Sequence, residues 1–469
     1  MEWNFSKGQG LEKVSAFDSE PQRSVRKLAT EILTKVDTRK AYADVLLDHT
    51  IKSAALDGRD RALLTELIYG TLRWRGRLDP CLSESIRGSL EETDPFIRNL
   101  LRLTLYQLDF LDRIPDYAAV NEAVKVAKTH GGRRAAGFVN GVLRNVVREK
   151  RAIIPPEPAE RRVEDFAEYW SHPKWLVQRW LQYFGSEEIT ALLKANNDEA
   201  PLVLRTNRTR GTRETLLDLF GTQGVKAVPC SWSPEGIVIR SGGPVDQLPG
   251  FQAGLFQVQG EASQLVVYLL DPKPGERILD ACSAPGGKTT HIAEFMDDRG
   301  HIIAIDISAK GIRRVEQNAR RLGLTSIQAL RADLTRGTTI PLDESYDRIL
   351  VDAPCSGFGT LRSHPEIKWT RSESDIRRLS QLQKKLLFRA ASYLKPGGVL
   401  VYSTCTLIED ENEKVVEDFL KYQEGFVLEE AAGYLPDQAK SLVRGSYFMA
   451  WPHRHDTDGF FAARLRKVA

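Results

Sequence analysis

Two cysteines stand where a reactive thiol could work. The stretch YDRILVDAPCSG (346–357) runs a strand-like apolar segment into Asp352 and then, three residues later, into Cys355. A second apolar segment, GGVLVYSTC, ends at Cys405. A thiol just past the end of a strand can be partly exposed and can act as a nucleophile or assist one. Each cysteine by itself is more typical of a buried structural thiol, whereas a pair at two strand ends favours catalysis.

A glycine-rich turn, CSAPGGKT (282–289), follows a third apolar segment and opens a predicted helix whose free N–H groups could hold a polar or charged ligand. The turn matches part of the P-loop pattern GxxxxGK[ST] through Gly287, Lys288 and Thr289. That pattern requires glycine where Cys282 stands. A phosphate-binding ATPase is therefore an alternative that the turn alone leaves open.

Two carboxylates favour a nucleoside ligand without a phosphate chain. Asp306 closes the strand-like segment of AIDIS about twenty residues after the glycine turn, where an acidic side chain accepts hydrogen bonds from ribose hydroxyls in doubly wound folds. Asp333 closes the next segment, in RAD, where it could reach an adenine edge. Pro285 leaves the turn with fewer N–H groups than a P-loop offers. S-adenosylmethionine is a nucleoside of this kind.

The elements that must position these residues alternate between strand and helix after about residue 260. Apolar strands interleaved with amphipathic helices, including a long helix over 374–394, predict a doubly wound, mostly parallel sheet with helices on both faces. Ligands of such sheets bind beyond the carboxyl ends of the strands. The sequence therefore predicts a Rossmann-like α/β domain over 261–469 with its site at that edge.

The preceding chain divides into three parts. Residues 1–21 lack periodicity and are predicted to be a flexible tail. Apolar residues at three- and four-residue spacing predict an all-α domain over 22–150. A proline-rich linker (151–162) then leads into a small RRM-like α+β module, within 151–260, built from strands around PLVLRTN and GIVIRS. This module could be an RNA-facing platform or a packing annex of the next domain.

Composition restricts the class of protein. The net charge is only +3, but arginines cluster at 71–77, 131–134 and 143–151, which fits either nucleic-acid backbone contacts or a solvated helix face. The five cysteines are scattered without a CxxC pair, which argues against a disulfide framework and a zinc site. Neither a signal peptide nor a transmembrane stretch is present in the pattern, so we expect a cytoplasmic protein.

The motifs DACSAPGGKT, IDIS, ADLT, VDAPCSGFGT and STCT, in this order and spacing, resemble those of the RNA 5-methylcytosine methyltransferases of the NOL1/NOP2/Sun family. The helical segment FVNGVLRN (138–145) resembles the NusB-like domain that bacterial members carry ahead of the catalytic domain. The resemblance covers nearly the whole chain from about residue 22. Ser283 and Phe358 depart from the family pattern, and could alter a cofactor contact and a base-pocket contact.

The resemblance implies S-adenosylmethionine-dependent methylation of carbon 5 of a cytosine in small-subunit ribosomal RNA, without a metal, by a monomer whose α domain binds RNA. It implies that Cys405 attacks carbon 6 and that Cys355 serves the release step. Asp352 would hydrogen-bond the cytosine edge, as a protonated acid or through the exocyclic amine. Lys288 would stabilise the thiolate or the base carbonyl, or pair with an acid. Cofactor contacts are predicted from Cys282, Ser283, Ala284, Pro285, Gly286, Gly287, Lys288, Asp306, Asp333 and Asp352.

Three alternatives remain at this point: the same chemistry on transfer RNA or large-subunit RNA, a P-loop-like ATPase, and a non-catalytic RNA-binding assembly factor with this fold. The intact cysteine pair distinguishes the enzyme from the assembly factor. One further segment, RSHPEIKW (362–369), could contact RNA through Arg362, His364 and Lys368, or could be an ordinary surface loop.

Overall fold

A computed structural model describes residues 24–54, 56–149, 162–336 and 345–468. The tail predicted over 1–21 and the linker predicted over 151–162 lie, apart from Arg162, outside these residues. The chain forms two compact units. The first comprises residues 1–71 and 81–151, and the second comprises 72–80 and 152–469. The domain limits predicted at 150 and 260 stay predictions.

The first unit is helical, as predicted. Its helices are α1 (Val25–Arg39), α2 (Ala43–Ser53), α3 (Gly58–Ser85, of which 72–80 belongs to the second unit), α4 (Pro95–Phe110) and α5 (Asp116–Glu149). Asp94 caps α4 by accepting from the N–H groups of Phe96 and Ile97, and Pro95 stands at the first helical position. Eleven residues of α4 are buried, which makes it the central helix of this unit. Gly132, with φ of +68°, breaks α5 into two helices.

The second unit begins with α6 (Val163–Tyr169) and α7 (Lys174–Ala195), followed by a small antiparallel sheet of order β2-β3-β1-β4. The strands are β1 (Leu202–Thr206), β2 (Lys226–Pro229), β3 (Gly236–Ser241) and β4 (Phe256–Val258), and α8 (Arg213–Thr222) packs on one face. The two predicted strands are confirmed as β1 and β3. β2 and β4 were not predicted, because each is only three or four residues long.

The rest of the second unit is a nine-stranded sheet. Its strands are β5 (Arg277–Asp280), β6 (His301–Asp306), β7 (Ile327–Arg331), β8 (Tyr346–Asp352), β9 (Leu394–Thr404), β10 (Phe426–Glu429), β11 (Val443–Arg444), β12 (Tyr447–Ala450) and β13 (Phe460–Lys467). β9, β8, β5, β6 and β7 are parallel in that order. β13, β12, β11 and β10 add an antiparallel flank beyond β9. The parallel part is as predicted, and the flank is an addition.

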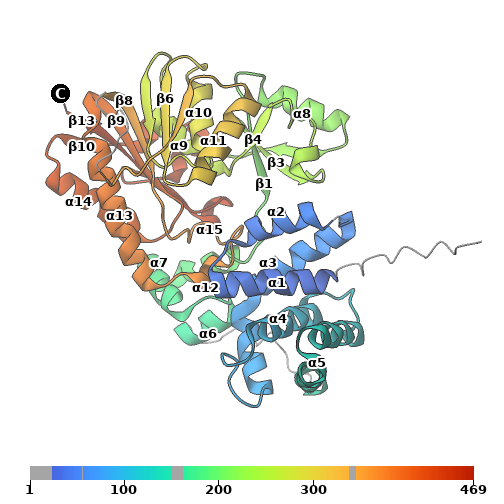
Figure 1. Ribbon diagram of the computed structural model, residues 1–469. Coiled ribbons are helices and arrows are strands. Elements are labelled where there is room, and N and C mark those ends of the chain that lie inside the picture. Colours follow the sequence, from blue (N-terminus) through green and yellow to red (C-terminus); the bar gives the residue numbers. More distant parts are fainter. Residues whose placement is uncertain (1–23, 55, 150–161, 337–344, 469) are drawn as a thin grey trace, which may run out of the picture. The chain divides into compact units, whose positions relative to one another are not determined.

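Helices cover both faces of the large sheet (Figure 1). One face carries α9 (Glu261–Leu270), α10 (Gly287–Phe295) and α11 (Ala309–Leu322), and the other carries α13 (Glu373–Ala391) and α14 (Glu413–Tyr422). Neighbouring residues of one strand enter opposite cores, since Leu350 packs with Ile278 on the first face while Ile349 packs with Leu279 on the second. Short helices α12 (Ile367–Thr370) and α15 (Pro452–His455) lie in the connections.

The helix predicted over 374–394 ends earlier, at Ala391. The chain turns at Ser392 and Tyr393 and enters β9 at Leu394, so that β9 can pair with Tyr346 at the start of β8. Strand pairing therefore ends the helix.

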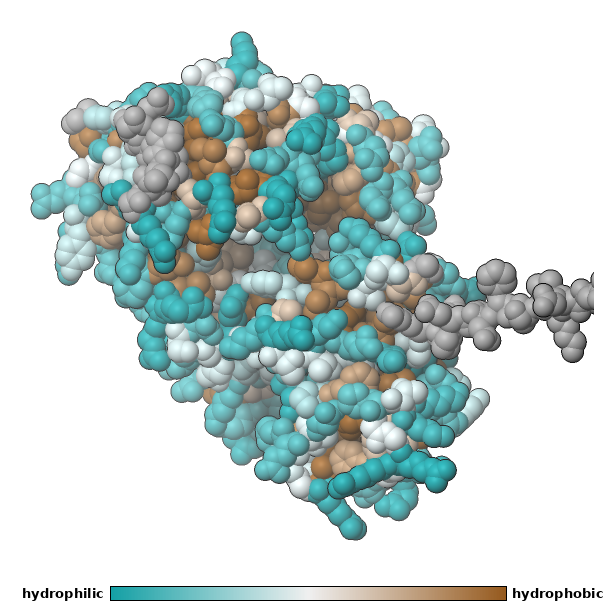
Figure 2. Space-filling model, viewed as in Figure 1, coloured by the Kyte–Doolittle hydropathy of each residue, from teal (hydrophilic) through white to brown (hydrophobic). Residues whose placement is uncertain are grey.

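Among the described residues, no helix combines the length and apolarity needed to cross a membrane. In the space-filling view, hydrophilic side chains cover most of the visible face, and hydrophobic ones show in the gaps between them (Figure 2).

Candidate active site

The order of the parallel strands creates a crevice at their carboxyl ends. From β5 the chain proceeds outward through β6 and β7, and then returns to place β8 and β9 on the other side of β5. The connections after β5 and β8 thus leave in opposite directions, and ligands of doubly wound sheets bind at such a switch point. The predicted site residues lie at or just beyond the ends of these five strands.

The two thiols meet at this edge. The Sγ atoms of Cys355, after β8, and Cys405, after β9, lie 3.2 Å apart. A Cys355 thiol that donates to the Cys405 sulfur favours the thiolate form of Cys405. This hydrogen bond lowers the pKa of Cys405 below its usual value, and Lys288 and His364 add to the effect electrostatically. The same bond, together with burial, raises the pKa of Cys355. The pair is therefore asymmetric, with Cys405 as the better nucleophile.

Lys288 and Asp352 form an ion pair beside the thiols. Lys288 Nζ donates to Asp352 Oδ2 at 2.7 Å, and Ser403 Oγ donates to Asp352 Oδ1 at 2.8 Å. The Lys288 ammonium also lies 4.7 Å from the centre of the Phe460 ring. Of the alternatives open for Lys288, pairing with an acid is present. As an ion-paired carboxylate, Asp352 can accept hydrogen bonds but not donate them.

A buried polar network joins the two cysteine turns, and the sequence argument missed it. Ser356 Oγ and Thr406 Oγ1, one residue beyond each cysteine, lie 2.8 Å apart. Glu411 Oε2 accepts from the Ser356 N–H at 2.8 Å and from Gln383 Nε2 at 2.9 Å. Gln383 Nε2 also donates to Pro354 O at 3.0 Å. The acidic run LIEDENE after STCT was a signal for this network, because one of its carboxylates is buried rather than solvated.

The glycine-rich turn packs tightly against β6 and α11. Gly286 has a φ of +100°, and a Cβ there would lie 3.0 Å from the Cα of Val315, so only glycine fits. Asp306 Oδ2 accepts from the Ala284 N–H at 3.2 Å, and Oδ1 accepts from the Ser308 N–H at 2.8 Å. Asp306 thus lies beside the turn, as predicted from the chain spacing.

Ile307, directly after Asp306, was not singled out by the sequence argument. Its side chain is 67% exposed, an unusual position for isoleucine. An exposed apolar side chain next to a carboxylate suits the flat face of a purine whose ribose hydroxyls reach that carboxylate. In AIDIS, apolar and polar residues alternate, and an isoleucine follows the charged end of the strand. This pattern was the available signal for Ile307.

Asp333 lies past β7 and is engaged locally. Its Oδ1 accepts from the N–H of Thr335 at 3.0 Å and from the Thr335 hydroxyl at 2.6 Å, and Oδ2 lies 3.3 Å from Arg336 Nε. Cys282 has a pKa raised well above its usual value by burial, which makes it a poor nucleophile. The Ser283 side chain is 5% exposed, and its Oγ has no hydrogen-bond partner among the described residues.

Asp280, the last residue of β5, is a further residue that the sequence argument missed. It is 1% exposed, and burial raises its pKa to about 7. Oδ2 accepts from Thr289 Oγ1 at 2.7 Å, whereas Oδ1 has no hydrogen-bond partner in the described part of the chain. The negative charge of Asp352 also raises the pKa of Asp280, and Lys288 lowers it. The strand end ILD, preceding the glycine turn, was the signal for it.

The RNA contact predicted for the segment 362–369 is wrong for two of its three side chains. Arg362 is 7% exposed and donates to Asp456 and to the Glu199 carbonyl. Lys368 is 1% exposed, and its ammonium is surrounded by three oxygens, including Asn197 Oδ1 at 2.6 Å. Neither side chain can reach RNA or behave as part of a surface loop. A basic sequence cannot reveal that its side chains are buried and donate to oxygens from distant segments.

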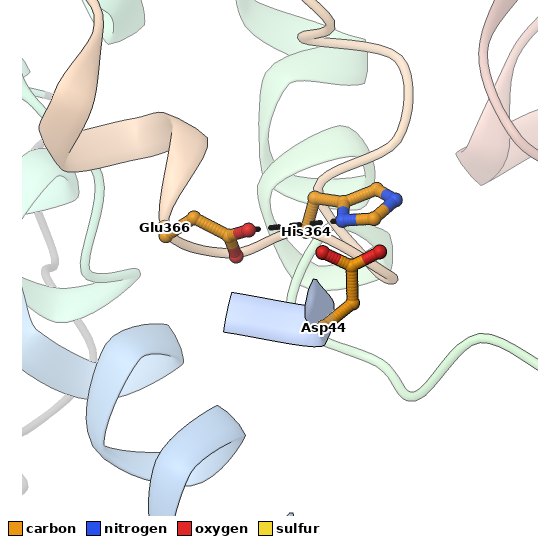
Figure 3. Close-up of side chains that lie close together, drawn as sticks. All are labelled: Asp44, His364 and Glu366. Atoms are coloured by element: carbon orange, nitrogen blue, oxygen red, sulfur yellow. Dashed lines mark ion pairs between the residues drawn. The ribbon is translucent and has the colours of Figure 1, made fainter. Parts of the chain in front are cut away.

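His364, on the same segment, lies beside Glu366, and Nδ1 is 3.7 Å from a carboxylate oxygen (Figure 3). Its side chain is 31% exposed. Of the three residues predicted to contact RNA, it is the one still accessible.

Two other predictions need correction. In the cluster 71–77, Arg73 and Arg77 are buried and donate to the carbonyls of Arg362 and Tyr169. Arg77 also lies over the ring of Tyr169 at 4.5 Å. Both guanidiniums are buried and hydrogen-bonded within the protein, so they are not available for phosphate contacts. Phe358 is fully buried and packs edge-on against two tryptophans, so it makes no base-pocket contact.

Three family descriptions match successive parts of the chain. The NusB family matches residues 23–148, a ferredoxin-like domain of RsmF/B-like methyltransferases matches 172–246, and the description "16S rRNA methyltransferase RsmB/F" matches 267–466. The fold class predicted from the sequence is confirmed by these matches together with the elements above.

Curated relatives match over almost the whole chain. The chain is 38% identical over 448 residues to the probable ribosomal RNA small subunit methyltransferase B of Bacillus subtilis, covering 95% of this chain and 99% of the relative. It is 37% identical over 449 residues to the ribosomal RNA small subunit methyltransferase B of Pseudomonas syringae pathovar tomato, covering 95% and 97%.

Two solved structures are similar in fold to this chain. The crystal structure of the protein PH0851 matches with a TM-score of 0.81 and 27% identity, covering 95% of this chain and 99% of that one. The structure of NSun6 from Pyrococcus horikoshii with SFG matches with a TM-score of 0.56 and 26% identity, covering 63% and 98%.

Proposed function

This chain belongs to the family of bacterial small-subunit ribosomal RNA methyltransferases B, and from that premise we propose that it methylates carbon 5 of a cytosine in 16S ribosomal RNA. The observation that carries the cytosine assignment is the pair of thiols 3.2 Å apart at the crevice, with the pKa of one lowered and that of the other raised. A methyltransferase acting on a nitrogen or oxygen would need no such pair.

The residues present fit S-adenosylmethionine as the cofactor. Asp306 would accept hydrogen bonds from the ribose hydroxyls, and the exposed Ile307 would cover one face of the adenine. Gly286 lets the turn pack directly against Val315 of α11, and the turn would face the rest of the molecule. When bound, the cofactor supplies an electrophilic methyl group. Asp333 and the remaining residues of the turn stay predicted contacts.

The protein's own residues prepare the cytosine. Carbon 5 of cytosine is a poor nucleophile, and addition of the Cys405 sulfur to carbon 6 makes carbon 5 enamine-like. Asp352 would accept a hydrogen bond from the exocyclic amine, because an ion-paired carboxylate is a strong acceptor. Lys288 holds that carboxylate in place and favours the thiolate of Cys405.

Release reverses the activation. Once carbon 5 carries the methyl group, the carbon–hydrogen bond at carbon 5 breaks, its electron pair restores the double bond to carbon 6, and the bond from carbon 6 to Cys405 breaks. Cys405 leaves as a thiolate. Cys355 serves as the partner of the base that takes this proton or, after giving up its own thiol proton, as the base itself, since it lies against the departing sulfur.

The substrate cytosine must leave its stack to reach a crevice at strand ends, which suits a loop or partly folded ribosomal RNA. The NusB-like unit would supply RNA affinity. We further propose that the enzyme works as a cytoplasmic monomer without a metal. The same chemistry on transfer RNA or large-subunit RNA is the alternative, and the P-loop ATPase has no support from the family.

Bisulfite sequencing of total RNA, from cells that have the chain and cells that lack it, tests this function. We expect one cytosine of 16S ribosomal RNA to lose protection when the chain is absent, and to regain it with the wild-type gene but not with Cys405→Ala. If the protected cytosine that disappears lies in transfer RNA or large-subunit RNA instead, that RNA would be the substrate. An unchanged methylation map would overturn the proposal.

A further inference from the structure

Arg205 is an arginine of the small four-stranded sheet that is fully buried. It stands on β1 and is 0% exposed, and so is the side chain of its ion-pair partner Glu294, on α10. Its Nη2 lies 2.6 Å from one carboxylate oxygen of Glu294, and its Nε donates to the other at 3.2 Å. Arg205 therefore leaves its own sheet and reaches the helix that begins at the glycine-rich turn.

The other hydrogen bonds of Arg205 reach the first turn of that helix, apart from one that Nη1 donates to Gln259 Oε1, directly after β4. Nη1 donates to the Gly287 carbonyl at 2.7 Å, and Nη2 donates to Thr290 Oγ1 at 3.1 Å. Thr290 Oγ1 in turn donates to the Gly286 carbonyl at 2.8 Å. One planar guanidinium thus fixes the two glycine carbonyls directly before Lys288.

Stability alone is a weak reason for this arrangement. A buried ion pair recovers its desolvation cost only in part, and apolar residues of similar volume are often as stable. What an apolar pair cannot do is orient two peptide carbonyls, because this needs the rigid fork of a guanidinium. The orientation matters at this place, since Gly286 and Gly287 are part of the glycine-rich turn and Lys288 pairs with Asp352.

We propose that Arg205 is a positioning residue of the methyl-transfer site, through which the ferredoxin-like module sets the conformation of the glycine-rich turn and of Lys288. This rests on the proposed function for its meaning in catalysis, but the contacts belong to the free protein. The module is thereby part of the cofactor site, although Arg205 touches neither cofactor nor reacting atoms.

The test uses the double variant Arg205→Met/Glu294→Leu in the full chain, which removes both charges and leaves no unpaired one. The matched control is Arg208→Met. Arg208, on the same module, lies over the Phe295 ring at 4.2 Å, at the far end of α10, and it pairs with Glu235 at 3.6 Å. Both variants lose a cation that touches α10, but only the first loses contacts to the glycine turn.

Two measurements decide the outcome. Hydrogen exchange of the ligand-free protein should be at least about tenfold faster over residues 283–291 in the double variant, with other segments unchanged. Calorimetry with S-adenosylhomocysteine should give an affinity about tenfold weaker, with an unchanged affinity for RNA. Arg208→Met should match the wild type in both. Wild-type exchange and wild-type affinity in the double variant, or an equal loss in Arg208→Met, would overturn the proposal.

If the double variant does not fold, Thr290→Val decides instead, because it cuts the path from Arg205 to the Gly286 carbonyl and keeps both charges. We expect faster exchange over the same segment and an affinity about threefold weaker, and wild-type values would overturn the proposal. A wild-type protein that binds no S-adenosylhomocysteine would contradict the proposed function, whereas the exchange measurement would still judge the role of Arg205.

Discussion

The two sides of the crevice are built differently. On the β8 and β9 side, Cys355 and Cys405 are in contact, and a buried network of Ser356, Thr406 and Glu411 joins their turns. On the β6 side, the carboxylate of Asp306 accepts from two backbone N–H groups and from no other group among the described residues, and its neighbour Ile307 is open to solvent. Reacting groups must be fixed before the substrate arrives, whereas a side that exchanges its ligand must stay accessible. The difference indicates which side performs the chemistry and which side binds.

The largest expected effect separates the two thiols. Cys405→Ala should abolish methylation without forming an adduct, because the attacking sulfur is gone. Cys355→Ala should attack and methylate, and then stall with RNA attached. Denaturing gels after incubation with substrate RNA and S-adenosylmethionine measure this as a slowly migrating, protease-sensitive band.

The double variant Cys355→Ala/Cys405→Ala is the control, and it should lose the band. A band from Cys405→Ala would exchange the assigned roles. Methylation intact in both single variants, with no band, would mean that the thiols merely pack, and the contrast between the two sides would then have no chemical meaning.

The second prediction concerns Asp280, on the strand between the two sides. Its pKa is about 7 in the folded protein and 3.8 is the usual value, so the folded state holds a proton that the unfolded state has lost between these pH values. The contribution of Asp280 to the free energy of unfolding should therefore be complete below pH 4. It should be lost as the pH rises towards about 7, which lowers the stability by at most about 4 kcal/mol.

Asp280→Asn keeps an acceptor for Thr289 and cannot ionise. Urea unfolding from pH 5 to pH 8 should thus show a smaller loss of stability in Asp280→Asn than in the wild type. Parallel curves for the two proteins would contradict the raised pKa.

The third prediction concerns the binding side. Asp306→Ala should weaken S-adenosylhomocysteine binding about 10- to 100-fold, since hydrogen bonds to a charged group contribute about 1.5–3 kcal/mol. RNA affinity should stay the same. Asp333→Ala is the matched comparison, and we expect only a small loss, because that carboxylate is occupied by Thr335 and Arg336. Calorimetry measures both, and equal losses would show that Asp333 also turns to the ligand.

Residue order along the chain was enough to predict the strand-end residues, because parallel strands bring their carboxyl ends to one edge whatever the details of packing. It could not predict which charges are buried. Lys368 and Arg362 look like RNA contacts in sequence, and the oxygens that accept their hydrogen bonds come from Asn197 and Asp456, far away in the chain. Arg205 is the converse case. It was part of a predicted strand, and nothing local indicated that it reaches across to another sheet's helix.

The smallest effect is expected for the hydrogen bond that joins the two cysteine turns. Ser356→Ala and Thr406→Val each remove the contact of 2.8 Å between the two hydroxyls. A hydrogen bond of this kind contributes about 1 kcal/mol, so each variant should methylate about fivefold more slowly. Cofactor affinity should not change, since the contact lies on the other side of the crevice from Asp306. Because both variants break one interaction, the double variant should be no slower than either single variant. Single-turnover methylation rates of the wild type, the two single variants and the double variant measure this coupling. Additive losses of activation free energy would mean that the two hydroxyls act on their cysteines separately.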